Sequence, residues 1–236
     1  MLMLNFYWRG HSAMEMGLIV QTLPAYKHPV PRRSKAVLPG RCGQVEEKLF
    51  PDTIWEEVSY TVNCAIRPGC NREAVIKWLS GEGELSFSNM PFTVFQAAIE
   101  AEIPAVELVE DHPGSYLSLA PTFVCQPWRY SFPAAQRSLL DGDNTGVNPF
   151  TYAALPYITV QGKAGDTVTF ACNGLTLEVL LGDSGCAEID CDGEWICGGF
   201  GSGDFPALPP GQWTMQVSGL DGQEASATMK PRYRRI

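Results

Sequence analysis

The chain has 236 residues, enough for one large or two ordinary domains that each bury a core. Apolar residues make up 45% and charged residues 18%, which excludes a disordered chain, and the 23 Gly and 18 Pro favour short strands and turns over long helices. No apolar run reaches the ~18 residues that span a bilayer, so we expect no membrane insertion and synthesis in the cytoplasm.

The net charge of −9 is unevenly distributed. Residues 138–229 contain 12 acidic residues and a single Lys, whereas residues 1–137 are close to neutral and residues 230–236 carry four basic residues. Such an acidic second half disfavours nucleic-acid binding on its surface. Three arginines in the last segment, Arg232, Arg234 and Arg235, could pair with the carboxylates of that half.

The first half is predicted to be mainly β with one helix. Residues 58–66 alternate apolar and polar side chains, which indicates a half-buried strand. A short helix is expected to follow, because Asn71 can cap its start and Gly81 can end it. Further short strands are expected near residues 85–87, 92–99, 105–109 and 117–125. Residues 1–133 are therefore predicted to form one domain.

The second half is predicted to be a β-sandwich. Residues 134–155 lose the apolar pattern and are rich in turn residues, so they are expected to form a linker. Residues 156–236 then carry six or more alternating segments, with a tight hairpin expected at Asn173-Gly174. This spacing of strands and turns favours a sandwich domain over residues 156–236.

Four cysteines of the second half are candidate ligands of a zinc site, namely Cys172, Cys186, Cys191 and Cys197. Their spacing lacks the paired knuckles of structural zinc sites, so we expect no metal and no cofactor. All eight cysteines of the chain are expected to be reduced thiols, because the cytoplasm keeps thiols reduced.

No catalytic set stands out, and the chain is not expected to be an enzyme. Asp190, Asp192 and Glu194 are the best candidates for a hydrolase, because glycoside hydrolysis uses two facing carboxylates. Neighbouring acids beside a turn are more often solvated, and the sequence contains neither a nucleophile elbow nor a phosphate-binding loop.

A basic, proline-rich segment near the N-terminus is a candidate contact region. Its prolines favour extended backbone, and it is either a solvated loop or an arm that contacts a neighbouring protein. The candidate interface residues are Lys27, Arg32, Arg33, Lys35 and Arg41. A second candidate surface consists of aromatic residues of the sandwich that could contact a partner or stack on a sugar: Tyr157, Trp195 and Trp213.

Several segments, in their order along nearly the whole chain, resemble the distal tail protein family of long-tailed bacteriophages. They are Phe6-Tyr7-Trp8-Arg9-Gly10-His11-Ser12, Val37-Leu38-Pro39-Gly40-Arg41-Cys42-Gly43, Trp78-Leu79-Ser80-Gly81-Glu82-Gly83-Glu84-Leu85, Phe123-Val124-Cys125-Gln126-Pro127-Trp128-Arg129-Tyr130, Pro156-Tyr157-Ile158-Thr159-Val160-Gln161-Gly162, Phe205-Pro206-Ala207-Leu208-Pro209-Pro210-Gly211 and Pro231-Arg232-Tyr233-Arg234.

The resemblance implies a mainly β fold, with an N-terminal split β-barrel that carries one α-helix and a C-terminal galectin-like β-sandwich. It also implies a structural subunit of the virion tail tip, assembled in the host cytoplasm as a homo-oligomeric, hexameric ring. Such a ring joins the tail tube protein to the tip protein, docks receptor-binding or baseplate proteins, and lets the phage DNA pass through its channel. The alternative function is that of a carbohydrate-binding protein, in which the sandwich is a module that binds host-surface glycans.

Overall fold

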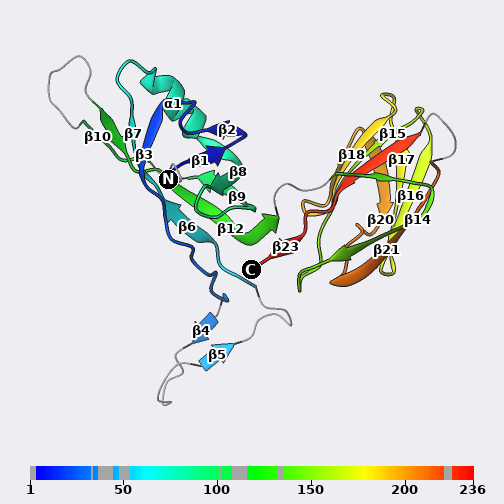
Figure 1. Ribbon diagram of the computed structural model, residues 1–236. Coiled ribbons are helices and arrows are strands. Elements are labelled where there is room, and N and C mark those ends of the chain that lie inside the picture. The colour runs from blue at the N-terminus through cyan, green and yellow to red at the C-terminus, as the bar shows by residue number, and fades with distance from the viewer. Residues whose placement is uncertain are drawn as a thin grey trace. The chain divides into compact units, whose positions relative to one another are not determined.

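The structure is a computed structural model that describes residues 4–32, 34–36, 45–47, 54–100, 102–107, 116–131, 136–220 and 225–236 (Figure 1). The chain forms two compact units, Met1–Arg129 together with Ile236, and Tyr130–Arg235. Both units consist mainly of antiparallel strands. Within the described residues, the prediction of a mainly β fold, with one helix in the first half and a β-sandwich in the second half, is confirmed.

The first unit contains the strands up to β12. They are β1 (Phe6–Trp8), β2 (His11–Ser12), β3 (Leu18–Thr22), β4 (Ser34–Ala36), β5 (Val45–Glu47), β6 (Val58–Thr61), β7 (Asn63–Ile66), β8 (Gly81–Phe87), β9 (Thr93–Ile99), β10 (Ala105–Glu107), β11 (Leu117–Leu119) and β12 (Thr122–Ser131). One sheet has the order β2-β1-β8-β9-β12, and β6 also pairs with β12. Strand β23 (Arg234–Arg235) belongs to the second unit and pairs with β12, whose last residues, Tyr130 and Ser131, belong to that unit too. A second sheet has the order β10-β11-β7-β3.

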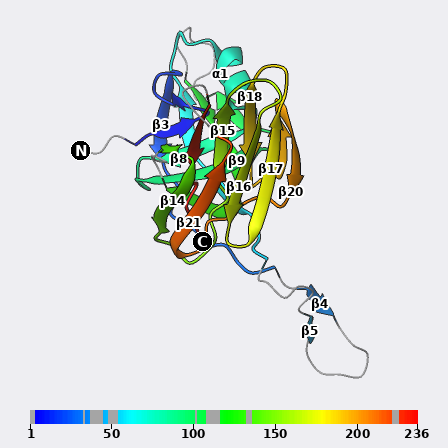
Figure 2. The same cartoon turned by 90° about the vertical axis from the view of Figure 1, so that its right-hand side faces the viewer.

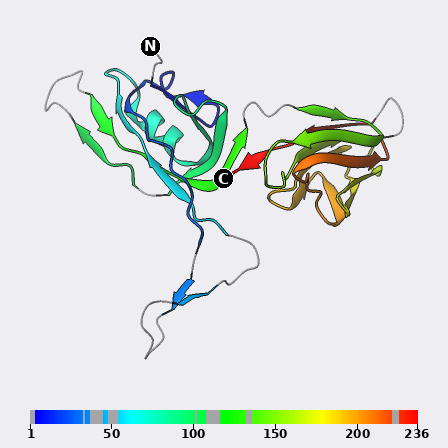
Figure 3. The ribbon, with the colours of Figure 1, turned by 60° about the horizontal axis from the view of Figure 1, so that its bottom comes forward.

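Strands β4 and β5 pair only with each other in the described sheets. Their register places Lys35 opposite Glu46. Figure 3 shows this hairpin apart from the other strands of the first unit. A two-stranded hairpin on its own has little stability in water, so the hairpin gains stability only when something covers it.

Helix α1 (Arg72–Leu79) begins and ends where the sequence predicted. The Asn71 side chain accepts a hydrogen bond from the Ala74 backbone N–H, which satisfies one of the free donors of the first turn. Val75 and Leu79 are buried on one face of the helix. Gly81 follows the cap with a φ of 97°, a left-handed conformation that glycine adopts without steric cost.

Aromatic rings fill the core of the first unit. Trp8 is fully buried, and its ring meets that of Phe123 edge to face at a centroid distance of 5.1 Å. Phe6 meets Phe123 in the same way at 5.6 Å. Because β1 and β12 contribute these rings, the residues nearest the N-terminus help to hold the strand that leads into the second unit.

The second unit is a sandwich of two five-stranded sheets. Its strands are β13 (Arg137–Leu139), β14 (Gly142–Asn148), β15 (Tyr157–Gln161), β16 (Thr167–Cys172), β17 (Leu175–Leu181), β18 (Cys186–Asp190), β19 (Trp195–Cys197), β20 (Gly199–Gly203), β21 (Gly211–Ser218) and β22 (Ser226–Lys230). The sheet orders are β13-β22-β15-β18-β19 and β14-β21-β16-β17-β20. Figure 2 shows β14, β21, β16, β17 and β20 side by side in this order.

Alternation along the sandwich strands follows the period-two rule. Ile158, Phe170 and Met215 are fully buried, while their neighbours along the strands are more exposed. The hairpin expected between β16 and β17 is present, and Asn173 and Gly174 have positive φ angles of 51° and 79°. Both values match the two-residue turn that the Asn-Gly pair favours.

The prediction of a linker at residues 134–155 is wrong. Strand β13 pairs with β22, and β14 pairs with β21 along its whole length, so both belong to the sandwich. The prediction missed them because β14 is a polar edge strand whose side chains do not alternate between apolar and polar. Gly146 lies under the Trp213 ring, and a Cβ there would approach the Trp213 Cζ2 atom to 2.3 Å, so this position is glycine for packing and not for a turn.

The unit boundary falls at residues 129 and 130, inside β12, and not at residue 133. Within the ranges that the structure describes, no helix is long and apolar enough to cross a bilayer.

Candidate functional site

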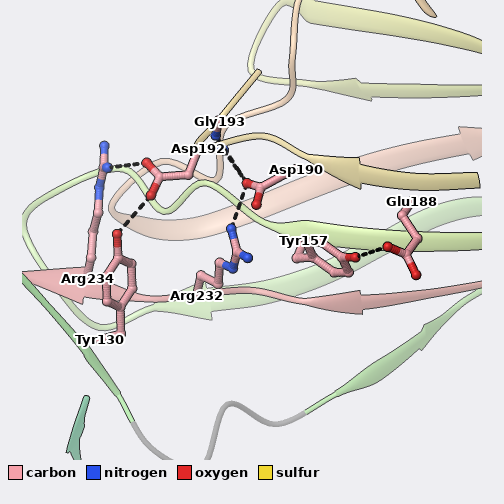
Figure 4. Close-up of polar contacts among 8 residues, drawn as sticks. All are labelled: Tyr130, Tyr157, Glu188, Asp190, Asp192, Gly193, Arg232 and Arg234. Atoms are coloured by element: carbon pink, nitrogen blue, oxygen red, sulfur yellow. Dashed lines mark hydrogen bonds and ion pairs between the residues drawn. The ribbon is translucent and has the colours of Figure 1, made fainter. Parts of the chain in front are cut away.

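Two ion pairs tie the C-terminal segment to the β18–β19 turn of the sandwich (Figure 4). The Arg232 Nη1 atom lies 2.7 Å from Asp190 Oδ1, and the Arg234 Nη1 atom lies 3.1 Å from Asp192 Oδ1. Asp190 ends β18 and Asp192 lies in the turn that follows. Two aspartates spaced two residues apart therefore pair with two arginines of the same spacing in the C-terminal segment. The pairing suggested by the basic end of the sequence is thus confirmed for Arg232 and Arg234.

Asp190 accepts three hydrogen bonds through a single carboxylate oxygen. Its Oδ1 atom also accepts hydrogen bonds from the backbone N–H groups of Asp192 at 2.9 Å and Gly193 at 3.2 Å. Burial by itself would raise the pKa of Asp190, but the Arg232 guanidinium and the two backbone donors outweigh it and hold the pKa below its ordinary value. Asp190 is therefore an anion held in place by its own domain.

Tyr130 adds the beginning of the unit to the same cluster. Its hydroxyl donates to Asp192 Oδ2 at 2.8 Å, and the Tyr130 pKa is raised by burial and by the Asp192 carboxylate. The Arg234 Nε atom donates to the Ala153 carbonyl at 2.8 Å. We call Tyr130, Asp190, Asp192, Arg232 and Arg234 the C-terminal clasp, because they join the first and last residues of the unit to the β18–β19 turn.

The clasp does not resemble the carboxylate pair of a hydrolase. Both aspartates are paired with arginines of the same chain. The pKa of Asp190 is lowered, whereas a carboxyl group that acts as a general acid needs a raised pKa. Glu194 is exposed at the end of the turn, directly before β19, and has a positive φ of 52°. The geometry supports a structural role for these acids.

Tyr157 and Trp195 form an aromatic patch on the outer face of the same sheet. Register places Lys230, Tyr157, Asp190 and Trp195 in one row across four strands. The Tyr157 and Trp195 rings meet edge to face at 6.3 Å, and Trp195 is 42% exposed. The Arg232 guanidinium lies 5.0 Å from the Tyr157 ring centroid, which links this aromatic patch to the clasp.

The Tyr157 hydroxyl donates to Glu188 Oε2 at 2.5 Å. Burial, together with this hydrogen bond to a carboxylate, raises the pKa of Tyr157 to about 12. The ring is thereby fixed at its polar end, and it lies beside the exposed Trp195 ring. A rigid, partly open aromatic pair of this kind can stack on an apolar group or on a sugar ring.

Trp213, the third aromatic residue proposed for this surface, is in the core and not on the surface. It is 3% exposed, and its Nε1 atom donates to the Tyr233 hydroxyl at 3.2 Å. The prediction of a contact role for Trp213 is therefore wrong. Its alternation with Met215 and Val217 along β21 is the signal that marks it as a core residue.

Of the basic residues of the predicted arm, Lys27 and Arg32 can be described in full, and they make separate contacts. The Lys27 Nζ atom donates to the Ser59 carbonyl at 2.6 Å and lies 5.8 Å from the Tyr60 ring centroid, so its charge is used within the first unit. Arg32 is exposed, and its backbone N–H donates to the Ile54 carbonyl at 2.7 Å. Lys35 belongs to β4, whereas Arg33 and Arg41 lie outside the described residues.

The described cysteines do not gather into a group that could hold a metal. Seven are free thiols and the eighth, Cys42, lies outside the described residues. In the sandwich, Cys172 and Cys191 are buried, whereas Cys186 and Cys197 are exposed. Burial raises the pKa of the Cys191 thiol to about 12, which disfavours the thiolate that a metal needs. Among the described residues no group of three or more potential ligands lies together.

A shallow polar pocket of about 250 Å³ lies beside the β16–β17 hairpin. Asp143, Thr176, Thr214 and Gln216 contribute polar side chains, and Ala171 contributes a small one. Sequence reasoning missed this pocket, because its residues come from four strands that only the sheet order brings together. It also missed Tyr130, for the same reason.

No protein-family model matches the chain, and no curated protein is similar to it in sequence. The fold, in contrast, is similar to that of a solved phage protein. That structure is the SPP1 Dit (gp 19.1) protein, described as a paradigm of the hub adsorption apparatus in phages that infect Gram-positive bacteria. The likeness covers 99% of each chain with a TM-score of 0.58 at 15% sequence identity. At this identity the likeness establishes the fold.

Proposed function

We propose that this protein is a structural, non-enzymatic distal tail protein of a long-tailed bacteriophage. Copies of the first unit would form a ring, hexameric by resemblance, that joins the tail tube to the tip protein. The sandwich would dock receptor-binding or baseplate proteins, and DNA would only pass through the channel. The observation that carries the proposal is a fold likeness to SPP1 Dit that extends over 99% of both chains.

The segments that resemble the family lie at positions that determine the fold, which supports the proposal. Trp8 of the opening segment is fully buried in the first core. Tyr130 ends the segment in β12 and belongs to the C-terminal clasp, as do Arg232 and Arg234 of the closing segment. The resemblance therefore involves residues that build the core of the first unit and the C-terminal clasp of the second.

Two features support placing self-association in the first unit and its arm. Tyr130–Arg235 contains 12 acidic residues against six basic ones, so copies packed around an axis through this unit would repel one another. The β4–β5 hairpin pairs with no other described strand and carries Lys35, next to the exposed Arg32. An arm that reaches over a neighbour gives the asymmetric contact that a closed ring requires.

Electron microscopy of the purified protein tests this assignment. Deletion of residues 26–38, and separately the charge reversal Arg32→Glu, Arg33→Glu and Lys35→Glu, should abolish rings and leave the thermal unfolding of the sandwich unchanged. The matched control is Arg72→Glu, Lys77→Glu and Lys163→Glu, which changes the net charge equally at exposed sites outside the arm. Rings that survive both arm variants would show that self-association lies elsewhere.

A carbohydrate-binding role is the second candidate, and the aromatic patch of Tyr157 and Trp195 favours it. Glycan-array binding by the purified protein, lost in Trp195→Ala, would support this role. A wild-type protein that binds no glycan on the array would refute it.

A further inference from the structure

One side of the sandwich is an open edge without charged residues or proline. Among the strands that the structure describes, β19 ends one sheet and β20 ends the other, and the chain passes from β19 to β20 through Gly198 alone. Figure 2 shows β20 at the edge of its sheet. Residues 195–203 read WICGGFGSG and contain no charge and no proline. Sheet edges usually carry charges, proline or bulges that prevent another strand from pairing with them. We call residues 195–203 the open edge.

The hydrogen-bond pattern identifies which backbone groups of β20 face outward. The Gly182 N–H donates to the Gly198 carbonyl, and the Asp204 N–H donates to the Thr176 carbonyl. In an antiparallel pair, residues alternate between facing the partner and facing away from it. The even-numbered residues of β20 therefore face β17, and the N–H and C=O groups of Gly199, Gly201 and Gly203 point toward the open side.

Exposed apolar side chains flank these backbone groups. Phe200 is 74% exposed and pairs with Leu180, which is 43% exposed, on the outer face of the sheet. Trp195 is 42% exposed on β19. Gly201 has a separate explanation, because a Cβ there would lie 2.1 Å from Ile196 Cδ1 inside the sandwich. The apolar side chains that an added strand could meet on the outer face of this sheet are therefore those of Phe200 and Leu180.

Carboxylates surround the open edge. Glu194 precedes it and Asp204 follows it in the chain. Glu178 pairs with Ser202, and Glu188 pairs with Cys197, in the neighbouring strands. A second copy of the sandwich pairing along β20 would bring two such acidic borders together, which is unfavourable. A strand with basic ends would meet opposite charge at both ends of the edge.

From these observations we propose that the open edge binds an extended segment of a different protein by adding a strand to β20. The segment would be uncharged and partly apolar in its middle, where it meets Phe200, and would carry Lys or Arg near its ends. Backbone hydrogen bonds to the three outward glycines supply the binding, and the carboxylates select the charge. The inference rests on the proposed function only for the source of the segment, which would be another tail protein.

The test uses the full-length protein, labelled with nitrogen-15, and three synthetic peptides. The first is blocked Lys-Thr-Val-Thr-Val-Thr-Lys, the second has Glu in place of both Lys, and the third is the first with methyl groups on alternate backbone nitrogens. We expect the basic peptide to shift the amide signals of Gly199, Gly201 and Gly203 and to slow their hydrogen exchange. The acidic peptide should bind about tenfold more weakly, and the methylated peptide should not bind at all.

Side-chain variants separate the contributions of the edge. Phe200→Ala, and the pair Glu178→Gln with Asp204→Asn, should each weaken the basic peptide about tenfold. The matched control is Phe92→Ala, which removes a 71% exposed aromatic ring of the first unit and should leave binding unchanged. Equal binding of the acidic and basic peptides, binding that survives backbone methylation, or amide shifts away from β20 would each overturn the proposal.

Ring formation gives a separate readout. Phe200→Ala should still form rings, because the open edge is not assigned to self-association. A wild-type protein that binds the peptide at β20 but forms no rings would refute the proposed function and leave this inference standing.

Discussion

Arg232 combines a strained backbone with two stabilising side-chain contacts, and this combination predicts an unusual mutational result. Its φ of 51° is left-handed, a conformation that costs a residue with a Cβ about 1–2 kcal/mol. The guanidinium is paired with Asp190 at 2.7 Å and lies 5.0 Å from the Tyr157 ring centroid. The contacts hold the residue in a conformation that glycine would adopt freely.

The expected sizes follow from the exposure of the pair. The Arg232 and Asp190 side chains are 26% and 13% exposed, so the ion pair lies between a surface pair and a buried one and contributes about 1 kcal/mol. The contact with Tyr157 adds about 0.5–1 kcal/mol. Arg232→Ala should therefore destabilise the sandwich by about 1.5–2 kcal/mol, and Arg232→Gly by about 1 kcal/mol less, because glycine relieves the backbone strain.

The assay is urea unfolding combined with hydrogen exchange at the amides of β15 and β18, which reports on the sandwich. Lys230 is the matched control, because it also lies beside the Tyr157 ring, at 5.9 Å, but in the extended strand β22. There Gly should be less stable than Ala. An Arg232→Gly protein as unstable as Arg232→Ala, or less stable, would show that the backbone stores no strain at this residue.

Three further outcomes are expected. The pKa of Asp190 is below its ordinary value, so the ionised carboxylate stabilises the fold above the unfolded-state pKa of about 4. This stabilisation should be lost as pH falls through the lower folded-state pKa. Thermal unfolding between neutral and acidic pH should show the loss, and the Asp190→Asn protein should not show it. The pKa of Tyr157 is raised to about 12, whereas an unfolded tyrosine ionises near pH 10. The stability of the sandwich should therefore fall as pH rises from about 10 toward 12. A Tyr157→Phe protein with the same alkaline loss of stability would show that Tyr157 is not its cause. Exposed Cys186 and Cys197 should react with a thiol reagent in the native protein, whereas buried Cys191 should react only after denaturation. All eight thiols should react in the denatured, unreduced protein, and a count of fewer than six free thiols would indicate disulfides.

The sequence predicted elements whose signals are local. Asn71 and Gly81 marked the ends of α1, and Asn173-Gly174 marked the hairpin, because each of these residues acts on the backbone within a few positions of itself. Apolar alternation predicted the strands that have one buried face, such as β15 and β16. The fold class follows from these elements in order.

Features that depend on distant partners were not predictable in the same way. Strand β14 is held by its pairing with β21, more than 60 residues later, and its own side chains carry no strand pattern. The clasp was anticipated only as a match of opposite charges, since nothing near Tyr130 in the sequence indicates that it meets Asp192. The open edge also required the sheet order, because an uncharged strand is exposed only if no other strand follows it.

Electron microscopy of the purified full-length protein tests the central claim most directly. The account predicts closed rings with a central channel and six copies, in which the first units form the inner ring and the acidic sandwiches lie at the periphery. Monomers under conditions where the protein is folded, or rings in which the sandwiches line the channel, would contradict it.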